Sequence, residues 1–242
     1  MKRSHGLTLM GLIMAIGIFQ ISNCRLESEI WNVESEILVV DLSKKLPDNP
    51  YQTEYERMLW PTVRIKALFS TGSGVVIGDY IITAAHVVGN NSTVEIELFY
   101  PITDGLSVLC GSVAMTDTAK DLALIKPSRP LSYTAKLAPA DYRPYIFTPV
   151  YSVGCSLGFP PRPSNGIISV ITDKYWEITS PILPGNSGGP VYDGRTYEVI
   201  GIAVWVRVYK DQLVTTMAGV VPIQSIYEFI NSNHENTKGE KH

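Results

Sequence analysis

The sequence has few cysteines and no strong excess of charge of either sign. Its 242 residues contain three cysteines, Cys24, Cys110 and Cys155, and no Cys-x-x-Cys pair. This excludes a disulfide-dense scaffold and a zinc site of the usual cysteine spacing. The formal net charge of -3 gives no indication of a nucleic-acid partner. We expect neither a metal nor a cofactor.

The chain also lacks an apolar run of the length that a membrane-spanning helix needs, about 18 to 20 residues. One uncharged run, Leu7 to Ile21, has 15 residues and follows the basic residues Lys2 and Arg3. This pattern predicts a signal peptide over 1–23 and export across the cytoplasmic membrane. An uncleaved membrane anchor is the alternative.

The run ends in ISNC, which resembles a bacterial lipobox, whose cysteine is lipidated and becomes the new N-terminus. The resemblance implies lipidation of Cys24 and membrane attachment through the N-terminus. Asn23 departs from the pattern, which has a small residue there, so both the lipoprotein and a plain exported protein stay open. Export permits a disulfide between Cys110 and Cys155, but we favour buried free thiols for both.

After a charged segment at 24–60, which we interpret as a tether with a short helix or turn around Tyr51 to Leu59, the pattern changes to short strands. In TVEIELF (93–99), Val94, Ile96 and Leu98 alternate with glutamates, which indicates a half-buried antiparallel strand. Many short, regularly spaced strands favour closed or sandwiched antiparallel sheets over a parallel α/β sheet.

Five prolines in 127–149 indicate a linker between two lobes, 61–126 and 150–231. The second lobe continues with strands up to 221. Ile223, Ile226, Tyr227 and Ile230 have helical spacing and predict a closing helix after Pro222. We expect the polar segment 232–242 to be a disordered tail.

Histidine is scarce in the part of the chain that we expect to fold. His5 lies in the signal, and His234 and His242 lie in the tail, which leaves His86 in ITAAHVV, directly after a predicted strand. A lone core histidine is more often a hydrogen-bonded packing residue than a catalyst. Only its neighbours in the fold can decide between these two roles.

A carboxylate and a serine complete a candidate site. Asp121 opens the apolar strand DLALIK, where an unpaired carboxylate would be costly, so it is the best candidate partner for His86. The alternative for Asp121 is a structural role as the cap of a turn. Asp117 in TDTAK is the second candidate for the partner of His86. A serine nucleophile needs such a histidine as general base, because its hydroxyl is weakly nucleophilic by itself.

The serine is Ser187, in the run PGNSGGP (184–190). The run is typical of a tight turn, and the backbone N–H groups of Gly185 and Ser187 can form an oxyanion hole if the turn directs both inward. A phosphate-binding loop is excluded, because no Lys-Ser/Thr pair and no helix pattern follow the glycines.

TAAH, DLAL and GNSGGP, in this order, resemble the trypsin-fold serine proteases, in particular the bacterial high-temperature-requirement (HtrA) branch. STGSGVVIG, VGCSLGFP, SNGIISVI and AGVVPIQSIYEFI extend the resemblance over 61–231. It implies an all-β fold of two six-stranded antiparallel β-barrels of the trypsin-like type with a short C-terminal helix. It also implies that His86 is the general base and acid, that Asp121 orients it, and that Ser187 is the nucleophile in the cleft between the barrels.

Three departures from the family pattern change the expectations. Asn186 replaces the aspartate of zymogen-activated members and no Ile-Val-Gly-Gly start is visible, so we expect no activation by a new N-terminus. The chain ends soon after the closing helix, so we expect no PDZ domain. Pro181 replaces the acid of trypsin-like members, and the alignment assigns Ile182, Ala203, Val204, Gly219 and Val220 to the primary substrate pocket.

We therefore predict an exported serine endopeptidase that acts on protein or peptide substrates through an acyl-enzyme intermediate. A small or medium aliphatic residue before the scissile bond is the expected preference. The alternative is a catalytically inactive binding module of the same fold. An α/β-hydrolase esterase is rejected, because that fold orders its triad Ser, Asp, His along the chain.

Overall fold

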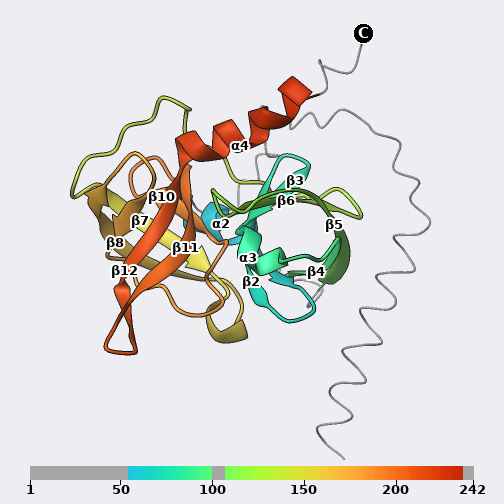
Figure 1. Cartoon of the computed structure of the whole chain (residues 1–242), viewed down its shortest axis with the longest axis horizontal. Helices are drawn as coiled ribbons and strands as arrows, with labels where there is room; N and C mark the ends of the chain where they lie inside the picture. Colours follow the sequence, from blue (N-terminus) through green and yellow to red (C-terminus); the bar gives the residue numbers. More distant parts are fainter. Residues whose placement is uncertain (1–53, 100–106, 237–242) are drawn as a thin grey trace, which may run out of the picture.

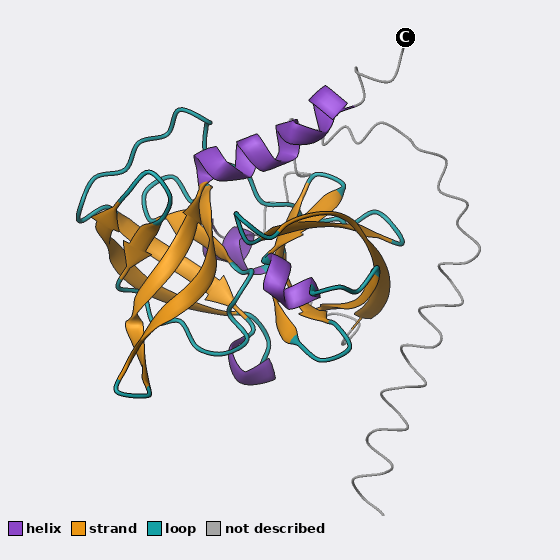
Figure 2. Cartoon of the chain, viewed as in Figure 1, coloured by secondary structure: helices purple, strands orange, loops and turns teal. Residues whose placement is uncertain are grey.

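The computed structural model describes residues 54–99 and 107–236. This part of the chain forms two closed antiparallel barrels of six strands each, which lie side by side (Figure 1). Strands dominate, and the helices are few (Figure 2). The predicted fold class is confirmed. The predicted signal peptide, Cys24 and the tether up to residue 53 lie outside the described residues.

The first barrel closes in the order β1-β2-β3-β6-β5-β4. Its strands alternate between core and surface, as in β1, where Val63 and Ile65 are fully buried and Arg64 and Lys66 point outward. The strands are β1 (Thr62–Lys66), β2 (Thr71–Ile77), β3 (Tyr80–Thr83), β4 (Thr93–Leu98), β5 (Ser107–Asp117) and β6 (Leu122–Pro127).

Strand β4 departs from the simple alternation that its sequence predicts. Val94 and Ile96 are buried, but Glu97, expected on the solvent face, is only 2% exposed. Antiparallel pairing of β4 with β1 places Arg64 opposite Glu97, and Arg64 and Lys66 both form ion pairs with its carboxylate. Glu97 is therefore covered by cationic side chains on the outside of the barrel.

The second barrel closes in the order β10-β11-β12-β9-β8-β7. Strand β10 begins directly after the glycine-rich turn. The β11–β12 hairpin is the longest and extends beyond the barrel (Figure 1). The strands are β7 (Pro149–Gly154), β8 (Arg162–Ile171), β9 (Trp176–Ile178), β10 (Pro190–Asp193), β11 (Val199–Tyr209) and β12 (Gln212–Pro222).

Two helices at the ends of the described chain contact both barrels. The carbonyl of Met58 in α2 (Glu54–Leu59) accepts hydrogen bonds from Thr62 of β1 and Tyr192 of β10, each at 3.1 Å. Helix α4 (Ile223–Asn236) starts on the second barrel and runs across toward the first (Figure 1). Among the described residues, no helix is long and apolar enough to cross a membrane.

Helix α4 corrects the predicted start of the disordered tail. The apolar positions that predicted the helix, Ile223, Ile226 and Ile230, are buried. The helix then continues to Asn236, five residues into the segment 232–242 that we expected to be disordered. Once the packed turns form the nucleus, each further residue adds a hydrogen bond at little cost.

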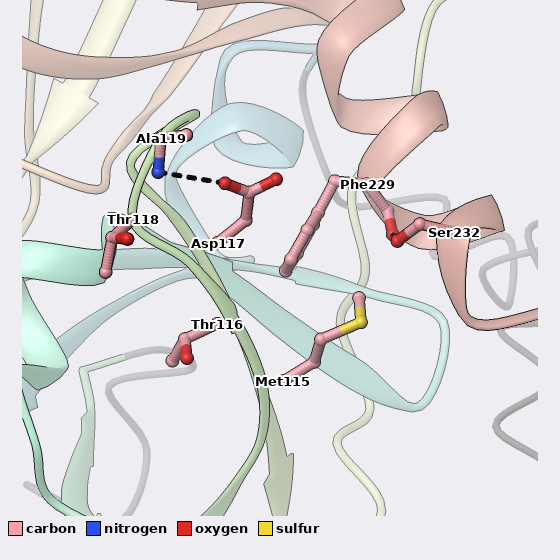
Figure 3. Close-up of a pocket in the computed structure, with 7 residues that line it drawn as sticks. All are labelled: Met115, Thr116, Asp117, Thr118, Ala119, Phe229 and Ser232. Atoms are coloured by element: carbon pink, nitrogen blue, oxygen red, sulfur yellow. Dashed lines mark hydrogen bonds between the residues drawn. The ribbon is translucent and has the colours of Figure 1, made fainter. Parts of the chain in front are cut away.

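A hollow of about 430 Å³ lies beside α4 and is lined by Phe229 and Ser232 of the helix and by the end of β5 (Figure 3).

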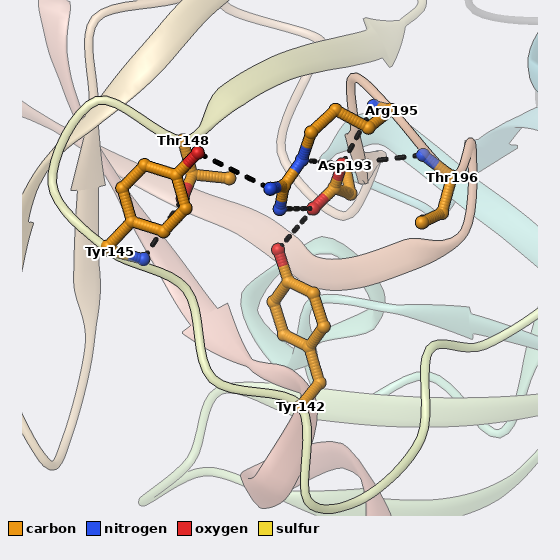
Figure 4. Close-up of polar contacts among 6 residues, drawn as sticks. All are labelled: Tyr142, Tyr145, Thr148, Asp193, Arg195 and Thr196. Atoms are coloured by element: carbon orange, nitrogen blue, oxygen red, sulfur yellow. Dashed lines mark hydrogen bonds and ion pairs between the residues drawn. The ribbon is translucent and has the colours of Figure 1, made fainter.

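The segment between the barrels is held by a polar cluster around Asp193 (Figure 4). The buried Asp193 carboxylate accepts hydrogen bonds from the hydroxyl of Tyr142 at 2.5 Å and from the guanidinium of Arg195 at 2.8 Å. Burial raises the pKa of Asp193, but its hydrogen bonds from Arg195 and Tyr142 outweigh burial and leave this pKa below its usual value. Tyr142, between the barrels, is thereby fixed to β10.

Candidate active site

His86 and Asp121 meet at one edge of the first barrel. His86 lies in α3 (Ala85–Val88), directly after β3, and Asp121 directly precedes β6, which pairs with β3. One carboxylate oxygen lies 2.8 Å from Nδ1 of His86, and the other accepts the His86 backbone N–H at 2.9 Å. Within the described residues, Nε2 of His86 has no hydrogen-bond partner.

The Asp121 side chain is less buried than its strand suggested. Leu122, Ala123 and Leu124 are fully buried, but the Asp121 side chain is 32% exposed and that of His86 is 47% exposed. Asp121 has a positive φ of 54°, so the chain turns sharply there and directs the side chain to the barrel edge instead of the core. The position of the Asp121 carboxylate is therefore explained by its two hydrogen bonds with His86 and not by burial alone.

Asp117, the second candidate for the partner of His86, instead caps a turn, which was the alternative role considered for Asp121. One of its oxygens accepts the backbone N–H groups of Ala119 and Lys120, both at 2.9 Å, and the other lies 3.3 Å from the Lys120 ammonium. Burial raises the pKa of Asp117, but the hydrogen bonds and charge of Lys120 lower it by more.

The turn at 184–189 uses nearly every peptide group that it contains. Its carbonyls accept hydrogen bonds: Pro184 from Leu157, Gly185 from the Ser73 hydroxyl, Asn186 from Gly189, and Ser187 from the Ser73 backbone. The N–H groups of Asn186, Gly188 and Gly189 donate to Leu183, Ala203 and Asn186. Within the described part of the chain, the N–H groups of Gly185 and Ser187 have no acceptor.

Glycine is required in this turn by both conformation and space. Gly185 and Gly188 have φ values of 97° and 85°, which side chains rarely adopt. A Cβ on Gly185 would lie 2.5 Å from the carbonyl oxygen of Cys155, and one on Gly188 would lie 2.2 Å from that of Ser73. The turn is therefore packed directly against backbone from both barrels.

The same contacts bring the serine turn to the histidine. A Cβ on Gly72 of β2 would lie 2.5 Å from Val87, the residue after His86, and 2.7 Å from the carbonyl oxygen of Ser187. A Cβ on Gly188 would lie 2.9 Å from the backbone nitrogen of Ala84. The segments that carry His86 and Ser187 therefore pack against each other across the two barrels.

Ser73 is a residue of this site that the sequence analysis missed. Its N–H donates to the Ser187 carbonyl at 2.7 Å, and its hydroxyl donates to the Gly185 carbonyl at 2.7 Å and accepts the Cys155 N–H at 2.8 Å. Ser73 is fully buried. In the sequence, Ser73 is marked only by its place between Gly72 and Gly74, and this pattern does not indicate which residues it bonds to.

Asn186 has a neutral partner in place of a charged one. Its side-chain oxygen accepts a hydrogen bond from the hydroxyl of Ser156 at 2.6 Å, and the residue is 5% exposed. Burial at this position is thus compensated without an ion pair.

The five residues assigned to the substrate pocket are all buried, at the base of the β11–β12 hairpin and in the turn before Ser187. Ala203 pairs with Val220, and the Ile182 N–H donates to Thr215 of β12 at 2.9 Å. The indole of Trp205, which the sequence analysis did not assign, lies against Gly219, since a Cβ there would approach it to 1.9 Å.

The cysteines differ from the expectation of two buried free thiols. Cys155 is free and fully buried, and burial raises the pKa of its thiol to about 12. Cys110, on β5, is half-buried instead of buried, so the expectation of a buried thiol there was wrong. Because Cys155 is free, the two do not pair. Within the described residues, no group of three His, Cys, Asp or Glu side chains could hold a metal ion.

Two closed barrels with a His–Asp pair on the first and a serine turn on the second define the class of trypsin-fold serine proteases. A trypsin-like peptidase domain matches residues 72–202, more than half of the chain. The chain belongs to this family, as the sequence motifs predicted.

Two relatives and one solved structure show the extent of the similarity. The chain is 30% identical over 198 residues to HhoA of Synechocystis sp., which covers 72% of this chain and 47% of that protein. It is 31% identical over 193 residues to a serine protease HtrA-like protein of Staphylococcus aureus, over 70% of this chain and 24% of the relative. The chain thus spans about half or less of these relatives.

The solved structure is a serine endoprotease from Yersinia pestis, with a TM-score of 0.64 and 19% identity. It covers 80% of this chain and 69% of that one. At this identity the match supports the fold alone.

Proposed function

We propose that the chain is an exported serine endopeptidase that cleaves peptide bonds through an acyl-enzyme intermediate. The observation that carries the proposal is that, within the described residues, the N–H groups of Gly185 and Ser187 have no acceptor, whereas the other N–H groups of the turn are bonded. Such preorganised donors stabilise the oxyanion of a tetrahedral intermediate, usually a large contribution to catalysis.

The roles of the side chains follow from the hydrogen bonds of His86. Asp121 accepts from Nδ1 and from the backbone N–H of the same residue, which fixes the ring and favours the tautomer with a lone pair on Nε2. Nε2 takes the Ser187 proton as the hydroxyl attacks the scissile carbonyl, and returns it to the leaving amine. Hydrolysis of the acyl-enzyme repeats these steps with water as the nucleophile.

We further propose a small or medium aliphatic residue before the scissile bond. Ile182, Ala203, Val204 and Val220 would give an apolar lining, and Trp205 limits the space over Gly219. Pro181 offers no charge for a Lys or Arg. Profiling with a peptide library should show cleavage after such aliphatic residues, and predominant cleavage after Lys or Arg would contradict this preference.

Export and lipidation of Cys24 rest on the first 24 residues alone. Expression of the full chain in a bacterium, followed by cell fractionation and labelling with a fatty-acid analogue, tests both. Fatty-acid label that is lost in Cys24→Ala supports the lipoprotein, and unlabelled protein in the periplasm or medium supports plain export.

Labelling with a fluorophosphonate probe tests the catalytic proposal. The wild type should label at Ser187, and Ser187→Ala and His86→Ala should not label. Asp117→Asn is the control, because Asp117 caps a turn beside the site and should label as the wild type does. A wild type that fails to label, or a Ser187→Ala variant that labels equally, would favour the inactive binding module.

A further inference from the structure

The first barrel contacts the serine turn through a loop of the second barrel, and this contact starts from a charged pair outside the core. Arg64 of β1 bonds to the Glu97 carboxylate and donates a further hydrogen bond to the carbonyl of Gly158. Gly158 belongs to η2 (Ser156–Gly158), the loop that follows β7 of the second barrel. The Arg64 and Glu97 side chains are 13% and 3% exposed.

The loop that Arg64 contacts holds the oxyanion turn directly. The N–H of Leu157 donates to the Pro184 carbonyl at 2.7 Å. The N–H and C=O of a trans peptide point in opposite directions, so this bond turns the N–H of Gly185 away from η2. The direction of one proposed oxyanion donor therefore depends on the position of Leu157.

The η2 loop needs external support in this conformation. Leu157 has a φ of 53° and Gly158 a φ of 77°, and the left-handed region is unfavourable for a non-glycine residue such as Leu157. The Leu157 side chain gains little in return, because the residue is 64% exposed. Such strain persists only where the surroundings hold it, and Arg64 holds the carbonyl of the next residue.

We propose that Arg64, oriented by Glu97, is a positioning residue for the oxyanion hole. It acts through Gly158 and Leu157 on the peptide between Pro184 and Gly185, and so it links the first barrel to catalytic geometry in the second. This inference rests on the proposed function. It predicts that loss of Arg64 slows the chemical step with little effect on the stability of the fold.

Lys66 provides a matched control on the same strand. It forms an ion pair with the same carboxylate, Glu97, and lies 3.2 Å from Glu95, but within the described residues it has no hydrogen bond to η2. Both Arg64→Met and Lys66→Met remove one cation from Glu97. Only the first removes the hydrogen bond to Gly158.

The experiment measures the maximal rate and half-saturation concentration of Ser187 labelling by a fluorophosphonate probe, with thermal unfolding followed by circular dichroism. We expect Arg64→Met to lower the maximal rate about 10- to 100-fold, the effect of a displacement near 1 Å in a catalytic group. Half-saturation and the unfolding midpoint should match those of Lys66→Met, which should label as the wild type does. The maximal rate of Arg64→Lys should lie between those of the wild type and Arg64→Met, because a single ammonium cannot bond to both Glu97 and Gly158 as the planar guanidinium does.

Equal maximal rates for Arg64→Met and Lys66→Met would overturn the inference while leaving the protease intact. If Arg64→Met does not fold, Arg64→Lys decides: a rate below that of Lys66→Met supports the inference, and an equal rate overturns it. A wild type that does not label would instead contradict the proposed function, so the two failures are distinguishable.

Discussion

In the first barrel, His86 and Asp121 meet through side chains that are 47% and 32% exposed, joined by two hydrogen bonds at a barrel edge. In the second, the Ser187 turn is packed against backbone on several sides, and its N–H groups are bonded except those of Gly185 and Ser187. One barrel thus contributes partly exposed side chains, and the other contributes a closely packed backbone turn. The difference separates proton transfer, which needs a side chain, from oxyanion binding, which needs fixed dipoles.

Replacing the exposed carboxylate should give the largest effect. Asp121→Asn keeps the size of the side chain but offers an amide to Nδ1 of His86, which favours the wrong tautomer. We expect the rate of fluorophosphonate labelling to fall by about 10⁴-fold, the order seen when a triad aspartate becomes asparagine. Asp117→Asn should stay within about twofold. A loss below tenfold for Asp121→Asn would show that the pair is structural.

A change in the rigid turn should have the second largest effect. Gly185→Ala places a Cβ 2.5 Å from the Cys155 carbonyl at a φ of 97°, so the turn must move and misdirect its N–H. We expect labelling to slow by about 100- to 1000-fold, the usual cost of one oxyanion donor.

The control for this change is Gly89→Ala, which also puts alanine at a positive φ, 55°, but with the nearest atom 3.9 Å away. It should lower the free energy of unfolding in urea by about 1 to 2 kcal/mol, the cost of a non-glycine residue at positive φ, and leave labelling nearly unchanged. Equal losses of labelling in both variants would indicate general strain in place of a specific turn geometry.

A substitution in the Asp193 cluster tests how much the polar connection between the barrels contributes to stability, and we expect a moderate effect. Asp193→Asn should lower the free energy of unfolding by about 2 kcal/mol at pH 7, the scale of hydrogen bonds to a charged group. The folded pKa of Asp193 lies below its unfolded value of about 3.9, so its ionised form stabilises the fold above that pH. This contribution is lost as the pH falls through the folded pKa.

Urea unfolding of wild type and variant between pH 3 and pH 7 checks this prediction. The difference between the two should be largest at pH 7 and should shrink below about pH 4. Tyr142→Phe removes one hydrogen bond to the same carboxylate and is the milder comparison. A difference that does not vary with pH would show that the Asp193 charge does not stabilise the fold.

The smallest effect is expected from Cys155, which lies beside the serine turn but is inaccessible. Its thiol is fully buried and has a pKa of about 12, so it should not react with a thiol reagent in the native state at pH 8. The wild type and Cys155→Ser should give equal thiol counts when native and differ by one when denatured. A native difference would mean that the backbone near the turn opens readily.

The sequence was sufficient for the fold class, and it singled out His86 and Asp121, which the structure brings together. Many short strands favoured closed or sandwiched antiparallel sheets, and the family resemblance implied two barrels. The single histidine in the region expected to fold left few choices for a base. The supporting residues could not be predicted in this way. Ser73 and Arg64 act through contacts to residues 112 and 94 positions away, and neither belongs to a motif that names its partner.

Other differences have equally local causes. Glu97 lies on the outer face of its strand, as the alternation of the sequence predicts, but the cationic side chains of β1 bury it there. The register between β1 and β4, which brings these residues together, cannot be read from one strand alone. Asp121 was assigned by the cost of burial, yet its positive φ takes it to the barrel edge.

The span of the contacts at Ser73 has a consequence for how the molecule folds. Its hydroxyl binds the Gly185 carbonyl, 112 residues along the chain, and closing a loop of that length is slow and entropically unfavourable. Neither barrel alone can complete the oxyanion turn. A chain that has formed one barrel, during synthesis or refolding, therefore carries Ser187 without this turn geometry, and the proposed catalytic activity would require the last docking step.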